Sequence, residues 1–171
     1  MKGKKRAFSD DPCPIARTLG IIGDWWSLLI IRNAIGQPQR FGELQRSLGL
    51  AKNILATRLR KLVDAEILET APASDGSAFN EYRLTEKGQQ LYVVLTALWQ
   101  WGERHVATRA TRSLQVIDRR SLQPIAPLEV RSLDGRRLGP GDLDVRMVEA
   151  AGTIGSGCPK SLDPPTRSQP G

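Results

Sequence analysis

The chain has 171 residues, a hydrophobic fraction of 40% and a formal net charge of +7, from 25 Lys and Arg against 18 Asp and Glu. A single histidine, His105, and two cysteines, Cys13 and Cys158, exclude His-rich metal clusters, four-cysteine zinc sites and a disulfide-stapled secreted scaffold. The basic balance indicates a polyanionic partner, with nucleic acid ahead of an anionic membrane surface. We expect a soluble, cytoplasmic protein, because no apolar run approaches the ~20 residues that cross a bilayer.

Two helices are predicted after a polar, basic arm over residues 1–11 that we expect to be disordered. The first spans Pro14–Ile22, where proline suits the first turn of a helix and a glycine follows the last residue. Asp24 is a typical N-cap for the second, Trp25–Ala34. Because this second helix is apolar nearly all round, we expect it to be the buried central helix.

Four further elements follow in a characteristic order. Shorter helices are predicted over Phe41–Leu48 and from Ala51 to about Ala65, with a Gly-Leu turn between them. The period then changes to that of strands over Ile67–Thr70 and Glu81–Leu84, and a long helix runs from Thr85 to around residue 107. Two helices joined by a short glycine turn, the second of them basic and followed by a hairpin, predict a winged helix-turn-helix fold that is mainly α with a small β wing.

The positive charge is concentrated in this helix-turn-helix. Residues 32–61 hold seven basic side chains against one acidic side chain, so this stretch alone has a net charge of +6. A solvated helical face is the simplest explanation of such a run, and a nucleic-acid surface is the alternative.

The fourth predicted helix favours the nucleic-acid surface. At 100° per residue, its leucines fall on one side, and Asn53, Thr57, Arg60 and Asp64 fall on the other. Asn and Arg side chains can read base edges in the major groove, whereas cations beside the groove contact phosphates. We therefore predict DNA contacts from Arg40, Lys52, Asn53, Thr57, Arg60 and Lys61.

Two neighbouring features modify this expectation. Arg58 projects nearer the buried side of the helix, so we expect either a structural ion pair or a contact to a backbone phosphate. The predicted wing loop, Pro72–Asn80, has no Lys or Arg and contains Asp75. A wing of this composition would contact DNA only through its backbone or its small side chains.

Five segments in this order and spacing resemble the HxlR-type family of bacterial winged helix-turn-helix regulators, over roughly residues 12–105. They are Cys13-Pro14-Ile15, the Gly-Asp-Trp-Trp segment 23–32, Arg40-Phe41-Gly42-Glu43-Leu44, the basic segment 55–62 and the segment 81–88. One departure is Ala51, which stands where a capping serine is usual, and the missing basic residue of the wing is another.

The resemblance implies a homodimer, paired through the first helix and the long helix after the wing, that binds a pseudo-palindromic operator in double-stranded DNA. It also implies a repressor that responds to a small molecule or to a redox or electrophile signal, with Cys13 at the position of a sensing cysteine. A thiol near a helix N-terminus in a basic segment is expected to carry more thiolate than a free cysteine. The alternative is that Cys13 is a small, buried, inert thiol.

The predicted domain organisation is the arm 1–11, the DNA-binding and dimerisation domain 12–110, a small antiparallel β extension over 113–150 and a disordered tail over 151–171. The β extension rests on the alternation of apolar and polar residues over 114–118, 128–132 and 143–148. Its role could be dimer support, ligand contact or packing alone.

No catalytic constellation, metal site or cofactor motif is found in the sequence, because His105 is the one histidine and no glycine-rich phosphate loop is present. We therefore expect a regulator, not an enzyme, with no cofactor. The remaining alternative is an adaptor that binds other proteins through a winged-helix fold and has lost DNA reading.

Overall fold

The computed structural model describes residues 10–73, 75–106 and 114–146. The chain divides into two units, residues 1–126 and 127–171, and each is described by itself. The predicted disordered tail, 151–171, lies outside the described residues, as does the predicted arm except for Asp10 and Asp11.

The first two helices have the predicted bounds: α1 spans Pro14–Ile22 and α2 spans Trp25–Ala34. Asp24 is the N-cap of α2 and accepts a hydrogen bond on Oδ1 from the backbone N–H of Ser27 at 2.9 Å. As expected, the helix is a buried part of the hydrophobic core, to which it contributes Ile30, Ile31 and Ala34. Its buried residues are Ser27, Ile30, Ile31 and Ala34.

The helix-turn-helix follows as α3, Phe41–Leu48, and α4, Lys52–Asp64. Gly49 ends α3 with φ +65°, a left-handed conformation that glycine adopts without steric cost. Ala51 is the N-cap of α4 and supplies no side-chain hydrogen bond. The recognition helix therefore begins without the side-chain cap that stabilises most helix starts.

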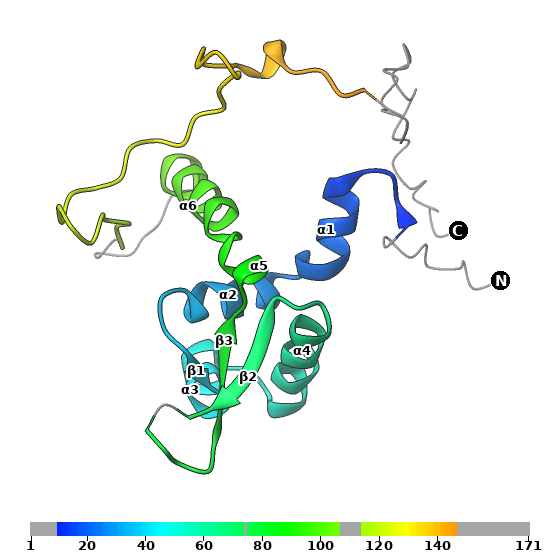
Figure 1. The fold of residues 1–171 in the computed structure, drawn as a ribbon, viewed down its shortest axis with the longest axis vertical. Helices are drawn as coiled ribbons and strands as arrows, with labels where there is room; N and C mark the ends of the chain where they lie inside the picture. The colour runs from blue at the N-terminus through cyan, green and yellow to red at the C-terminus, as the bar shows by residue number, and fades with distance from the viewer. Residues whose placement is uncertain (1–9, 74, 107–113, 147–171) are drawn as a thin grey trace, which may run out of the picture. The chain divides into compact units, whose positions relative to one another are not determined.

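The wing is part of a three-stranded antiparallel sheet with the order β1-β3-β2 (Figure 1). The predicted hairpin strands are β2, Leu68–Pro72, and β3, Asn80–Leu84. The third strand, β1, was not predicted; it is the pair Gln39–Arg40, which lies opposite Tyr82 and Glu81 of β3. A two-residue strand has no period to detect, so only its partner defines it.

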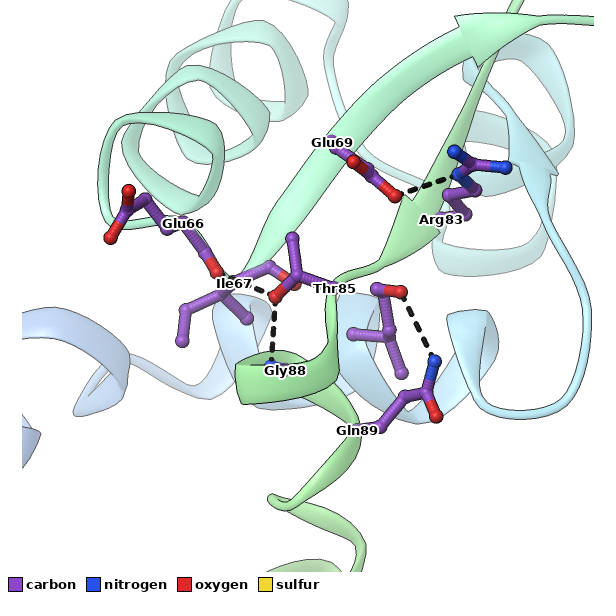
Figure 2. A network of polar contacts seen from close by, with 8 residues as sticks. Glu66, Ile67, Glu69, Arg83, Thr85, Gly88 and Gln89 are labelled. Carbon is purple, nitrogen blue, oxygen red and sulfur yellow. Dashed lines mark hydrogen bonds and ion pairs between the residues drawn. The ribbon is translucent and has the colours of Figure 1, made fainter.

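The junction between α4 and the wing is closed by an ordered set of hydrogen bonds. The backbone N–H of Glu66 donates to Val63 O and that of Ile67 donates to Leu62 O, each at 2.9 Å, which is the Schellman pattern of a helix end. Glu66 occupies its left-handed position with φ +57°. Figure 2 shows Thr85 beside this turn; its Oγ1 donates to Glu66 O at 2.6 Å and accepts from Gly88 N–H at 3.0 Å.

The single long helix predicted after the wing is wrong in one respect: it is broken into α5, Glu86–Gln89, and α6, Tyr92–His105. At the break, the N–H of Leu91 donates to Gly88 O at 3.1 Å, three residues back, so the chain tightens into a 3₁₀-type turn. Gly88 is packed against the wing, since a Cβ there would lie 2.1 Å from Ile67 O. The first turn is thus packed against the base of the wing, and α6 begins after the tightened turn.

The predicted β extension is not found in the described residues 114–146. They contain no strand, only the isolated bridges Ile117–Pro124 and Arg131–Arg137 and a short 3₁₀ helix, Pro140–Asp142. Residues 113 and 147–150 of the predicted extension, with the end of its third strand, lie outside the described residues. The apolar side chains that alternate in these segments stay exposed, among them Leu128, Val130 and Val145. Alternation forms a strand only when one face has a surface to pack on, and no such packing is present within this part of the chain.

In the part of the chain that the structure describes, no single helix is long and apolar enough to cross a membrane. The consecutive helices α1 and α2 reach that length and composition only as a pair, which is bent by 78°.

Candidate nucleic-acid interface

Helix α4 has two distinct faces, as its sequence predicted. Leu55, Leu59 and Leu62 are 0%, 1% and 0% exposed and fix the helix to the core. Lys52, Asn53, Thr57 and Arg60 are all exposed on the remaining surface. A buried leucine face and a polar outer face are the arrangement that a major-groove recognition helix requires.

The polar side chains of α4 differ in how freely they can reach a ligand. Thr57 Oγ1 donates to Asn53 O at 2.8 Å, so its hydroxyl hydrogen is used within the helix. Arg60 is exposed, and among the described residues no carboxylate forms an ion pair with it. Lys52 and Arg60 are therefore the long cationic side chains of α4 that have no carboxylate partner among the described residues.

Arg58 and Lys61 are held by the N-cap of α2. Arg58 Nε lies 3.3 Å from Asp24 Oδ1, and Lys61 Nζ lies 3.8 Å from Asp24 Oδ2. Burial raises the pKa of Asp24, but hydrogen bonds from Ser27 and the charges of Arg58 and Lys61 outweigh it and lower the pKa overall. Of the two roles considered for Arg58, the structural ion pair is the one present.

Arg40 is also paired, although it was predicted to contact phosphate. Its Nη2 lies 2.6 Å from Asp75 Oδ2 in the wing, and its Nε lies 3.3 Å from Glu81 Oε1 on β3. The hydrogen bond from Arg40 holds the pKa of Asp75 well below its usual range, with help from Ser77. The sequence predicted a wing with little positive charge. The ion pair lowers the positive charge of this region further, because Asp75 neutralises Arg40.

Two residues of this surface were not predicted. Arg46 is exposed on α3, with Nε donating to Gly42 O at 3.2 Å, and Phe79 is a 68% exposed aromatic in the wing. Both border one groove of about 510 Å³ together with Arg40 and Tyr82. The position of Arg46 on the outer side of α3 was readable from its helical period, whereas the exposure of Phe79 depends on the wing conformation.

Cys13 lies at the start of the fold, apart from α4. It is the N-cap of α1, half-buried and free, and its backbone N–H donates to Asp11 Oδ1 at 2.9 Å. Its position just before the first helix is the one that the sequence predicted. Among the described residues, no group of three His, Cys, Asp or Glu side chains is placed to hold a metal ion.

A family model described as HxlR-like helix-turn-helix matches residues 21–110, which is more than half of the 171 residues. The chain belongs to the HxlR-like helix-turn-helix family. The resemblance carried by the five sequence segments is therefore confirmed. An HxlR-like chain is a member of a transcriptional regulator family, and the mainly helical fold with its three-stranded antiparallel sheet matches that assignment.

Several HxlR-like relatives are similar to this chain. An uncharacterised HTH-type transcriptional regulator of Mycobacterium tuberculosis, Rv3095, is 39% identical over 92 residues, which cover 54% of this chain and 58% of that protein. The chain thus spans little more than half of that relative's length. The HTH-type transcriptional regulator YodB of Bacillus subtilis is 30% identical over 94 residues, 54% of this chain and 84% of YodB.

Solved structures extend the comparison beyond the family core. The crystal structure of PA1607, a candidate transcription factor, is 47% identical with a TM-score of 0.75 and covers 80% of this chain and 96% of that one. The redox regulator HypR in its oxidised form is 28% identical with a TM-score of 0.51, over 56% of this chain and all of HypR. A candidate transcription factor and a redox regulator thus share the helix-turn-helix fold of this chain.

Proposed function

We propose that this chain is a homodimeric, sequence-specific repressor that binds a pseudo-palindromic operator and responds to a small-molecule or redox signal. The observation that carries the proposal is the division of α4, with Leu55, Leu59 and Leu62 buried and Asn53, Thr57 and Arg60 exposed. A helix anchored in this way presents its polar face to a major groove. We assign Asn53, Thr57 and Arg60 to base edges and Lys52 to a phosphate.

Arg40 and Lys61 complete the proposed phosphate contacts, but both already form ion pairs within the protein. Each already lies beside a carboxylate, Asp75 or Asp24. A DNA phosphate has to replace or share these ion pairs, so we expect both side chains to add less affinity than Lys52 does.

Dimerisation is supported by apolar side chains that the described chain leaves uncovered. In α1, Ile15 and Leu19 are 69% and 56% exposed, and in α6 Leu98 and Trp101 are 49% and 59% exposed. No residue of α6 is buried. Exposed apolar side chains on two helices are typical of protein interfaces, and two copies would place two recognition helices about one turn of DNA apart.

The decisive experiment is equilibrium binding of the full chain to DNA from its own promoter region, by fluorescence anisotropy over a range of salt concentrations. We expect the logarithm of the binding constant to fall steeply with the logarithm of salt concentration. Arg60→Ala should cost about 1–3 kcal/mol at one base position of the operator. Arg104→Ala, which removes an exposed arginine from α6, is the matched control and should leave affinity unchanged.

Two results would contradict this function. Binding that is independent of salt and of DNA sequence would favour the adaptor hypothesis, in which the winged helix contacts only proteins. Equal affinity of the Arg60→Ala variant for every operator sequence would remove Arg60 from base reading. A reporter assay with the promoter then distinguishes repression from activation.

The redox response has its own test at Cys13. HypR is a redox regulator, and Cys13 is free and half-buried at the start of α1. We expect diamide or a quinone to change the operator affinity of the wild type and to have no effect on Cys13→Ser. Cys158 requires the same substitution as a control, because it is the second cysteine of the chain. An identical response in Cys13→Ser would assign the signal elsewhere.

A further inference from the structure

A groove with a volume of about 610 Å³ lies between α2 and α6. From α2 it is lined by Trp25, Leu28, Leu29 and Arg32. Its α6 wall includes Leu95, Trp99 and Leu98, and Leu98 also belongs to the apolar surface proposed for dimerisation. The four α2 positions follow a spacing of i, i+3, i+4 and i+7, so they share one helical face about 10 Å long. Pockets of 300–1,000 Å³ are the usual size for small organic ligands.

The groove is apolar and aromatic apart from one charge. Trp25 is 72% exposed and borders the groove from one side, while Trp99 and Tyr92 border it from α6. Arg32 is the one charged side chain that lines it within the described residues. Such a combination of flat aromatic walls and a single guanidinium selects for a ligand with an aromatic body and a negative end.

The charge of Arg32 is not balanced by an acidic group. Its Nε and Nη2 donate to Asn33 Oδ1 at 3.2 and 2.9 Å, and Asn33 Nδ2 in turn donates to Ser47 Oγ at 2.7 Å. Within the described ranges no carboxylate forms an ion pair with Arg32, whereas Arg40, Arg58 and Arg83 each have one. A neutral amide orients the guanidinium and leaves its positive charge uncompensated.

We propose that this groove binds an aromatic carboxylate, with the ring system against Trp25 and Trp99 and the carboxylate on Arg32. Asn33 occupies one edge of the guanidinium, so the end that carries Nη1 and Nη2 remains for the ligand. Two parallel N–H donors on that end match the two oxygens of a carboxylate. The ligand site is thus defined by an apolar slot and a pre-oriented cation.

The same helix connects the groove to the recognition helix. Trp25 is the first residue of α2, and the residue before it, Asp24, pairs with Arg58 of α4 at 3.3 Å. A ligand that shifts the start of α2 therefore acts directly on the group that anchors α4. This regulatory consequence rests on the proposed DNA-binding function, whereas binding of the carboxylate does not.

The test is isothermal titration calorimetry of the full chain with 2-naphthoate, and with the neutral 2-naphthalenemethanol as the matched ligand. We expect saturable binding of one naphthoate per chain and much weaker binding of the alcohol. Arg32→Gln should weaken naphthoate binding about tenfold or more, because a charge-assisted pair is lost, and should leave the alcohol unaffected. Arg104→Gln on α6, which is exposed and does not line the groove, should bind naphthoate as the wild type does.

A second variant tests the groove independently of Arg32, in case Arg32→Gln alters the folding of the domain. Leu28→Trp fills the slot, so it should abolish binding of both ligands while thermal unfolding confirms that the domain is intact. Equal affinity for the two ligands, or unchanged naphthoate binding in Arg32→Gln, overturns the proposal. So does an absence of naphthoate binding, including the case in which light scattering shows a second copy of the chain covering the groove.

Measuring DNA binding and naphthoate binding on the same protein distinguishes a failure of this inference from a failure of the proposed function. If the chain binds DNA but not naphthoate, the groove proposal fails and the regulator remains. If naphthoate binds through Arg32 but no DNA is bound at any salt concentration, the ligand site stands and the DNA-binding function fails. If both bind, naphthoate should change operator affinity in the wild type and not in Arg32→Gln.

Discussion

Asp24 and Arg58 join the start of α2 to the middle of the recognition helix, with 3.3 Å between Oδ1 and Nε. The same carboxylate caps α2, accepting from Ser27 N–H at 2.9 Å and from Ser27 Oγ at 2.7 Å. One side chain thus caps the central helix and also pairs with α4, which its buried leucines fix to the core.

Substitutions at Asp24 should separate these two roles. Asp24→Asn keeps a good N-cap but loses the ion pairs with Arg58 and Lys61, which are partly exposed, so we expect a loss of about 0.5–1 kcal/mol in unfolding free energy. Asp24→Ala also removes the cap and should cost about 1 kcal/mol more. Urea unfolding measures both. Asp64→Asn, an exposed aspartate of α4, is the control and should cost nothing.

The ion pair also predicts a pH dependence of stability. The folded-state pKa of Asp24 lies below its ordinary value of 3.8, so its contribution is complete above that value and is lost as pH falls through the folded pKa. Between pH 5 and pH 2 (about the range that spans both pKa values), the wild type should lose more unfolding free energy than Asp24→Asn. Parallel curves for the two proteins would show that Asp24 does not contribute this dependence.

Removing Asp75 should strengthen DNA binding. Asp75→Asn releases Arg40 Nη2 from an ion pair of 2.6 Å and makes it available to a phosphate, while Nε stays paired with Glu81 at 3.3 Å. We expect a few-fold tighter binding at low salt and a salt dependence steeper by about one phosphate contact. Fluorescence anisotropy with the operator measures both quantities.

Two controls test whether Arg40 mediates that gain. Glu103→Gln removes one negative charge from an exposed position on α6 and should leave affinity unchanged. In the double variant Asp75→Asn with Arg40→Ala, the gain should disappear relative to Arg40→Ala alone. A gain of the same size in both backgrounds would mean that Asp75 acts only by repelling DNA.

Glu66 offers a stabilising substitution. It occupies the left-handed position of the Schellman turn after α4, with φ +57°, where an L-residue costs roughly 1–2 kcal/mol. Glu66→Gly should raise the unfolding free energy by about 0.5–1 kcal/mol once the extra flexibility of glycine is subtracted. Glu66→Ala is the matched control, because it also loses the 3.8 Å pair with Lys87 but keeps the strain. Equal stabilities of the two variants would contradict the strain argument.

Two glycines in the helices after the wing should respond in opposite directions to alanine. At Gly88 a Cβ would lie 2.1 Å from Ile67 O, so Gly88→Ala has to displace the backbone at the base of the wing and should cost about 3 kcal/mol. At Gly102 a Cβ meets nothing within 4 Å, and Gly102→Ala should gain about 0.5–1 kcal/mol from helix propensity. Thermal unfolding of the pair provides the comparison. Similar effects at both positions would argue against close packing at Gly88.

Local patterns were sufficient to predict much of the fold. The leucine spacing in α4 identified Leu55, Leu59 and Leu62 as the buried face, and all three are fully enclosed. Asp24 was identified as a cap because its position before an apolar helix is itself a local signal. The DNA contacts assigned to that helix stay predictions.

The features that were missed depend on residues far apart in the chain. The pairing of Arg40 with Asp75 joins β1 to the wing and has no counterpart in any local period. The break before α6 follows a turn in which Gly88 is packed against Ile67, a residue 21 positions earlier at the base of the wing. The failure of the β extension has the opposite cause: the alternation at Leu128 and Val130 is real, but these side chains stay exposed.

At the turn between α5 and α6, a small rotation produces a large displacement at the far end of α6. α5 is fastened to the wing through Thr85 and Gly88, whereas the junction with α6 is held by two backbone hydrogen bonds, from Gln90 N–H to Glu86 O and from Leu91 N–H to Gly88 O. With its 14 residues, α6 is about 21 Å long. A rotation of about 10° at the turn therefore moves its far end by about 3.7 Å. That displacement is close to the ~3.4 Å rise of one base pair, so in the proposed dimer a bend of this size shifts the partner's recognition helix by about one step along DNA.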